Sequence, residues 1–135
     1  DITLAVRPEL LEIQNLGEFQ SVRESLSDED RKIFLSHPKD GANLIKKYFG
    51  AAPPDTDALA HQHHELPDGS GFPVGLKADK ISPLAALFIV AQDFSYYFLK
   101  DEDPTLDDFL LKCQSRYDFV NFRKVVKALE KIKKR

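Results

Sequence analysis

Two adjacent histidines, His63 and His64, are the residues of this sequence best suited to chemistry. Imidazole is the commonest side-chain ligand of transition metals. Neighbouring residues on a helix point about 100° apart, so this pair suits two neighbouring metals, or one metal and one substrate, better than a single ion. His61 precedes them and is expected to be a surface residue rather than a ligand. All three lie in the stretch 55–65, which is expected to be a helix.

The elements that position these histidines are predicted to be helices throughout. Several stretches space their apolar residues by three and four, and none shows sustained alternation of apolar and polar residues, so the fold class is all-α. Gly17 is expected to close the first, apolar-rich segment. The expected helical segments, in chain order, cover residues 8–18, 27–37, 38–49, 55–65, 82–98, 105–113 and 119–132.

Proline and glycine mark the predicted interruptions. Pro38 lacks an amide hydrogen and clashes with the preceding turn, so a kink or a break is expected at His37, with a second helix over 38–49 ended by Gly50. Residues 66–80 hold three glycines and two prolines. This composition cannot propagate a helix, so the segment is expected to be a shaped loop.

Capping residues indicate where three helices begin. Ser27 precedes acidic residues, Ser82 precedes Pro83, and Thr105 stands three positions before Asp108 in a weak capping box. The helix over 82–98 is expected to be the central core helix. Its broad apolar stripe is formed by Leu84, Leu87, Phe88, Ala91, Phe94 and Phe98.

The bulk properties limit the classes of function. The chain has 135 residues, enough for one domain, and a formal charge of −3, which gives no general reason to bind a nucleic-acid polymer. The single cysteine, Cys113, cannot form an internal disulfide, so a cytoplasmic setting is expected. No apolar stretch approaches the roughly 20 residues that span a bilayer, so we expect no membrane insertion within this chain.

The residues around and after the paired histidines make the signal specific. His63-His64-Glu65 is followed closely by a loop made of Asp68, Gly69, Ser70, Gly71, Phe72 and Pro73. This order resembles the signature of the HD-GYP family of the HD superfamily, in which His-His-Glu precedes an Asp-Gly-Ser-Gly-Tyr-Pro loop. His37-Pro38 resembles the family's His-Pro step. The resemblance covers about Gln14 to Tyr97.

The resemblance implies a helical bundle of the HD-domain type. It also implies hydrolysis of cyclic di-GMP at a centre of two or three metal ions, usually iron or manganese, with His37, His63 and His64 among the ligands. The family's signature loop is implicated in contacts with diguanylate cyclase domains. Here that loop is the Gly-Phe-Pro segment at Gly71–Pro73.

The rest of the family's active-site set departs from the pattern. Its remaining positions are taken by Gln14, Asn15, Glu18 and Gln92. Neutral amides are poor ligands for such metals, and Asn15 cannot supply the anionic bridge that holds two cations together. Asp93 lies one residue beyond Gln92, about 100° around the helix, so it is not expected to replace the missing ligand. The acidic run after Lys100 would repel an anionic dinucleotide.

Two interpretations of the histidine segment stay open. His63 and His64 are either relics, one hydrogen-bonded in the interior and one facing solvent, or residual ligands of one ion. Glu65 either orients a histidine through a hydrogen bond or caps the loop. The glycines and Asp68 have a structural role under either interpretation, because they suit a tight turn.

These patterns together predict one HD-GYP-like domain over 1–135, a bundle of about six helices that is catalytically inactive. The family's first helix is shortened or absent, so we expect a fragment or a chain that packs on a neighbouring domain. We expect a bacterial module acting in cyclic di-GMP signalling through protein contacts, with a diguanylate cyclase-type domain as the candidate partner. No cofactor is expected; if a metal binds, it is a single iron, manganese or zinc ion at His37, His63 and His64. The alternatives are a phosphodiesterase with a reduced metal site and a sensor that binds the nucleotide weakly without cutting it.

Overall fold

A computed structural model describes residues 16–133, and within that range the chain forms six α-helices, two 3₁₀ helices and no strand. The elements in chain order are α3 (Leu16–Val22), η1 (Arg23–Ser25), α4 (Asp28–Tyr48), α5 (Thr56–Gln62), η2 (Ala78–Lys80), α6 (Pro83–Lys100), α7 (Leu106–Arg116) and α8 (Val120–Lys133). The all-α prediction is confirmed. Gln14, Asn15 and most of the predicted segment 8–18 lie outside the described residues.

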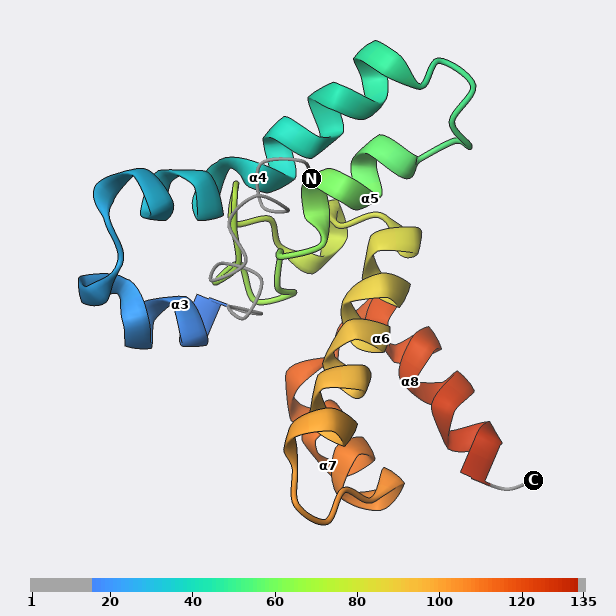
Figure 1. Cartoon of the computed structure of the whole chain (residues 1–135). Coiled ribbons are helices and arrows are strands. Elements are labelled where there is room, and N and C mark those ends of the chain that lie inside the picture. The colour runs from blue at the N-terminus through green and yellow to red at the C-terminus, as the bar shows by residue number, and fades with distance from the viewer. Residues whose placement is uncertain (1–15, 134–135) are drawn as a thin grey trace.

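The helices are arranged in two groups joined by the loop that follows α5 (Figure 1). In one group α4 and α5 form a hairpin, with α3 beside the start of α4. In the other, α6, α7 and α8 enclose the larger core, whose buried side chains include Ala85, Ala86, Ile89, Val90, Phe109, Leu110, Cys113, Tyr117, Phe122 and Val126. A smaller core of Phe19, Phe34 and Phe72 joins α3, α4 and the loop.

The three predicted helix caps are confirmed. The hydroxyl of Ser27 accepts a hydrogen bond from the amide of Asp30 at 3.1 Å, and Ser82 accepts one from Ala85 at 3.1 Å. Thr105 accepts from the amide of Asp108 at 3.2 Å and donates to its carboxylate at 2.8 Å. Each bond satisfies an amide that the first turn of a helix leaves without a backbone partner.

Three predicted boundaries are wrong. α4 continues through Pro38 as one helix, so the separate helix over 38–49 does not exist. Of the kink or break expected at His37, the break is absent, and the helix changes direction part-way along its length (Figure 1). α3 runs through Gly17 instead of ending there. α5 ends at Gln62, so His63 is its C-cap residue and His64 lies beyond it. The helix therefore stops before the paired histidines.

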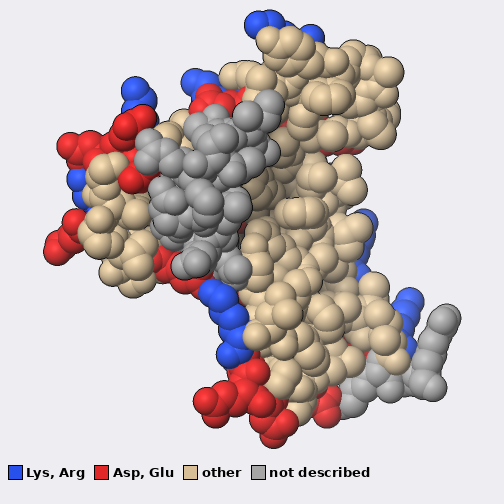
Figure 2. Space-filling view, viewed as in Figure 1, with Lys and Arg blue, Asp and Glu red and all other residues tan. Residues whose placement is uncertain are grey.

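The predicted core face of α6 is also wrong in part. Leu84, Leu87, Phe88 and Phe98 are exposed, whereas the buried side chains of this helix are Ala85, Ala86, Ile89 and Val90. α6 carries apolar residues on nearly all sides, so periodicity alone does not identify the face that packs inward. A large uncharged surface runs over α6 and the α4–α5 hairpin, and acidic side chains gather at the α6–α7 turn (Figure 2). Within residues 16–133, no helix has the length and apolar character that crossing a bilayer requires.

Candidate metal centre

Three histidines from two separate segments converge in the structure. His37 lies in the middle of α4, and His63 and His64 follow the last turn of α5. One ring nitrogen of each lies within 4.8 Å of the others, and among the described residues no other group of histidine, cysteine or carboxylate side chains is clustered in this way. The three ligand positions suggested by the sequence are therefore brought together.

The adjacent histidines do not diverge as a regular helix would require. The ring centroids of His63 and His64 are only 4.2 Å apart, and each ring lies about as close to that of His37, at 5.2 and 5.0 Å. The expected angle of about 100° assumes that both residues are helical. Because α5 ends at Gln62, the pair is free to face one point, and the preference for separate metals is not supported.

Backbone carbonyls determine which ring nitrogens carry protons. Nδ1 of His37 lies 2.6 Å from the carbonyl oxygen of Phe34, and Nδ1 of His63 lies 2.7 Å from that of Ala60. A carbonyl oxygen can only accept a hydrogen bond, so both Nδ1 atoms are the protonated nitrogens of neutral rings. The Nε2 atoms of both rings are therefore left with free lone pairs.

The two free nitrogens face each other at the spacing of metal ligands. Nε2 of His37 and Nε2 of His63 are 3.2 Å apart. With a lone pair on each atom, this contact cannot be a hydrogen bond. Two imidazole nitrogens bound to one ion at about 2.0–2.1 Å lie roughly 3.0–3.4 Å apart. The donor set and its spacing thus fit a single transition-metal ion.

Burial keeps the three histidines in the neutral form that binds metal. Removal from water lowers the pKa of His37 and lowers the pKa of His63 to about 4 and that of His64 to about 2. The bonds from Nδ1 to Phe34 and Ala60 oppose this shift only in part. Protons therefore compete weakly for the ligand nitrogens at neutral pH.

We expect the metal-free protein to lose stability as the pH falls from 7.5 to about 4.5. The unfolded chain binds protons near the ordinary histidine pKa of 6.5, whereas the folded histidines stay neutral until lower pH. The unfolded state then holds more protons in this window, so the free energy of unfolding decreases with decreasing pH. For His63 alone the shift is worth about 3 kcal/mol. Urea unfolding at both pH values measures it, and an equal loss in a His63→Gln/His64→Gln variant would contradict this origin.

Aromatic rings enclose one side of the cluster. Phe72, which the HD-GYP resemblance aligns with the tyrosine of the signature loop, stacks on His64 with centroids 4.6 Å apart and an interplanar angle of 13°. Phe34 lies 5.2 Å from Phe72, and Phe19 stacks on Phe34 at 4.8 Å. Phe72 is only 6% exposed, so its side chain fixes His64 and is not available to a protein partner. The exposed apolar side chain of this loop is Val74, at 61%.

A buried carboxylate shapes the loop after the histidines. Glu65 is 0% exposed; one carboxylate oxygen accepts from the amides of Val74 and Gly75 at 2.9 and 3.3 Å, and the other from Leu76 at 2.7 Å. Of the two roles left open by the sequence, this is loop capping. Asp68 supports the same loop from outside by accepting from the amide and hydroxyl of Ser70 at 2.9 and 2.6 Å.

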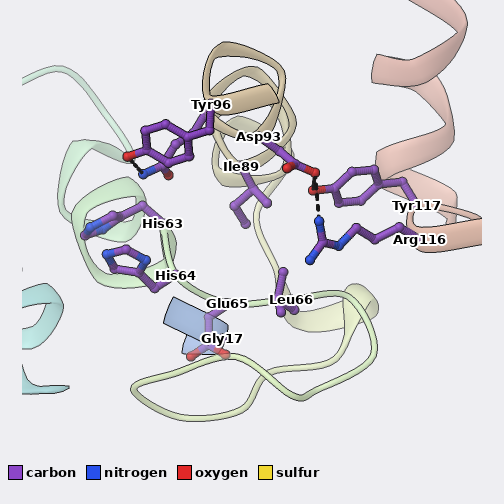
Figure 3. Close-up of a pocket in the computed structure, with 11 residues that line it drawn as sticks. Gly17, His63, His64, Glu65, Leu66, Ile89, Asp93, Tyr96, Arg116 and Tyr117 are labelled. Atoms are coloured by element: carbon purple, nitrogen blue, oxygen red, sulfur yellow. Dashed lines mark hydrogen bonds and ion pairs between the residues drawn. The ribbon is translucent and has the colours of Figure 1, made fainter. Parts of the chain in front are cut away.

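A cavity of about 180 Å³ opens beside the histidines. His63 and His64 lie at one end, and Asp93, Arg116 and Tyr117 lie across from them (Figure 3). Asp93 accepts from Tyr117 at 2.6 Å and from Arg116 at 3.1 Å, which agrees with the expectation that it does not replace a metal ligand. Nothing in the sequence pattern signalled Arg116, because a basic residue at a helix end ordinarily faces solvent.

Two of the positions that the HD-GYP resemblance interprets as replaced, Gln92 and Glu18, have other partners. The Nε2 amide group of Gln92 donates to the hydroxyl of Tyr96 at 2.8 Å, and both line the cavity. Glu18 accepts from Lys100 at 2.5 Å, an ion pair that ties α3 to the end of α6. His61 lies on α5 outside the histidine cluster. These side chains supply no anionic ligand to the cluster.

The sequence profile of the HD domain matches residues 14–103, which is more than half of the chain. The chain belongs to the HD domain family. The matched segment contains all three clustered histidines and ends after α6, so α7, with Arg116, lies beyond it. No curated protein and no solved structure matches this HD domain significantly. Membership indicates a metal-dependent, hydrolase-like domain, in agreement with the geometry of the three histidines.

Proposed function

We propose that this HD domain is a degenerate HD-GYP-type module that holds one metal ion and acts in bacterial cyclic di-GMP signalling through protein contacts. The observation that supports it is a cluster of three neutral histidines that, among the described residues, no carboxylate joins. A centre with two cations needs an anionic bridge between them. This proposal revises the expectation that no cofactor binds, and keeps the expectation of one ion at most.

The chemistry of the three histidine ligands indicates which metal the site prefers. Three imidazoles carry no charge, and manganese prefers oxygen ligands, so zinc or iron(II) suits the site better. Three protein ligands leave coordination positions open. When bound, the ion would act as a Lewis acid toward an oxygen of a ligand in the adjoining cavity. The chain's own contribution is to orient His37 and His63 through backbone carbonyls and to hold His64 against Phe72.

The purified chain is expected to bind one zinc or iron(II) ion and to leave cyclic di-GMP intact. Replacing His63 with alanine should weaken metal affinity on the order of 100-fold or more, because it removes one of three ligands. Metal analysis and calorimetric titration give stoichiometry and affinity, and chromatography detects linear pGpG or GMP. His61→Ala, in the last turn of α5 and outside the cluster, is the matched control. Two ions per chain, or turnover that His63→Ala abolishes, would overturn the proposal.

A phosphodiesterase with a reduced metal site is the second candidate, and the cavity favours it. Arg116 is half-exposed and has one hydrogen bond to Asp93, so other guanidinium donors can meet a phosphate. The acidic α6–α7 turn opposes it, because it repels a dianionic dinucleotide (Figure 2). The turnover assay above decides between the two. A titration with intact cyclic di-GMP tests the sensor alternative. If no binding is detected at hundreds of micromolar nucleotide, that alternative is rejected.

The proposed protein contact is assigned to the outer side of the loop at 66–80. Phe72 is buried against the histidines, so the exposed Val74 is the apolar side chain that a diguanylate cyclase-type domain would meet. A pulldown with the Val74→Asp variant tests it. A partner set identical to that of the unaltered protein would count against this surface.

A further inference from the structure

α4 passes through Pro38 without the amide that a helix normally uses at that position. In a regular α-helix the amide of residue 38 donates to the carbonyl oxygen of Phe34, four residues earlier. Proline has no amide hydrogen, and its ring crowds that same carbonyl. Phe34 and Pro38 are both buried. A buried carbonyl without a donor is costly, so another donor must replace the missing one.

The replacing donor is a metal-ligand candidate. Nδ1 of His37 lies 2.6 Å from the Phe34 carbonyl oxygen. The helix therefore stays intact at Pro38 because the preceding residue's ring takes over the lost hydrogen bond. The same bond leaves Nε2 of His37 as the unprotonated nitrogen, 3.2 Å from Nε2 of His63.

We propose that Pro38 is a positioning residue of the metal site. By removing the competing backbone amide, it reserves the Phe34 carbonyl for His37 and so fixes both the tautomer and the direction of the ligand ring. A hydrogen bond to the second ring nitrogen raises ligand basicity and orients the ring, which is the general role of such contacts at metal sites. With any other residue at position 38, the helix amide would also donate to this oxygen, and the imidazole would have to share it.

His63 reaches the same arrangement by another route. Its Nδ1 lies 2.7 Å from the carbonyl oxygen of Ala60, three residues earlier, as Phe34 is three residues before His37. Ala60 belongs to the last turn of α5, where carbonyls have no donor within the helix. At a helix end a carbonyl without an amide donor comes at no cost, whereas in mid-helix a proline four residues later provides one. His37 and His63 therefore share one requirement, a backbone carbonyl that accepts no hydrogen bond from a helix amide.

The test is the Pro38→Ala variant, with Pro83→Ala as the matched control at the first position of α6. In metal-free protein, ¹⁵N NMR of the imidazoles should show His37 protonated at Nδ1, and Pro38→Ala should shift part of that population to Nε2. Zinc affinity should fall about 10- to 100-fold, as for loss of a partner that orients a ligand. The melting temperature of the metal-free variant should stay level or rise, because alanine suits a helix interior. Pro83→Ala should change neither the tautomer nor the affinity.

The inference rests on the proposed metal site, but its NMR test does not. If the unaltered protein binds no metal, the proposed function fails while the tautomer measurement still stands. Wild-type His37 protonated at Nε2 would overturn the inference even if Pro38→Ala does not fold. A folded Pro38→Ala protein that keeps the Nδ1 tautomer and the original zinc affinity would also overturn it.

Discussion

Replacing Gly71 with alanine is expected to lower the free energy of unfolding by roughly 3–5 kcal/mol. A methyl group at this position would lie 2.4 Å from the amide nitrogen of Leu66, 2.5 Å from the carbonyl oxygen of His64 and 2.6 Å from the carbonyl carbon of Glu65. All three atoms belong to the backbone, so no side chain can rotate away. The loop must move, and it carries Phe72 away from His64. Chemical denaturation measures the loss, and metal titration measures its effect on the site.

Gly41→Ala is the matched control. Gly41 lies inside α4, and an added methyl group meets no heavy atom within 4 Å. Alanine in a helix interior is favoured over glycine by about 0.5–1 kcal/mol, so this variant should be slightly more stable than the unaltered protein. The same glycine-to-alanine substitution is thus expected to lower the stability at position 71 and to raise it at position 41. A Gly71→Ala protein as stable as Gly41→Ala would contradict the close backbone approach at the loop.

The features that the sequence predicted are those set by local chemistry. Ser27, Ser82 and Thr105 cap helices because a hydroxyl can reach an amide three residues away in almost any context. The loop at 66–80 follows from its glycines and prolines, which no helix accommodates. The all-α class follows from spacings of three and four. None of these depends on which helices later pack together.

The wrong predictions concern choices made by packing. α6 is apolar on nearly all sides, and the small side chains of Ala85 and Ala86 face the core while Leu87 remains outside, which spacing does not reveal. Pro38 alone does not distinguish a kink from a break, because the donor that keeps its helix continuous is a side chain whose rotamer is set by the fold. By contrast, the convergence of His37 and His63 across 26 residues agrees with what the family resemblance implied, although no local pattern encodes that contact.

The site is built largely from backbone groups that regular structure leaves free. The carbonyls of Phe34 and Ala60 orient His37 and His63, and the loop after them is held by amides that Glu65 gathers. Each arrangement places the neutral ligand nitrogens before any ion arrives. Among the described residues no carboxylate joins the three histidines, so the site has its geometry without negative charge, which supports the proposal of one ion rather than a centre with two.

Glu65→Gln is expected to destabilise the protein by about 3 kcal/mol. Glutamine keeps one accepting oxygen, so its amide group must face backbone donors on one side, either Leu76 or the pair Val74 and Gly75. Where the glutamine NH2 group faces a buried backbone amide, two donors meet. That backbone amide loses its charge-assisted hydrogen bond and gains no other acceptor. Because Phe72 belongs to the same loop, zinc affinity should fall as well. Chemical denaturation and metal titration of one preparation measure both effects.

Glu102→Gln provides the control, since Glu102 is exposed at the α6–α7 turn and the substitution is chemically identical. A surface substitution of this kind changes stability by no more than about 0.5 kcal/mol. If Glu65 instead oriented a histidine, Glu65→Gln would weaken metal binding while leaving the stability of the metal-free protein close to that of Glu102→Gln. If Glu65 caps the loop, Glu65→Gln destabilises the metal-free protein itself, and the loss of metal affinity is a consequence of that destabilisation.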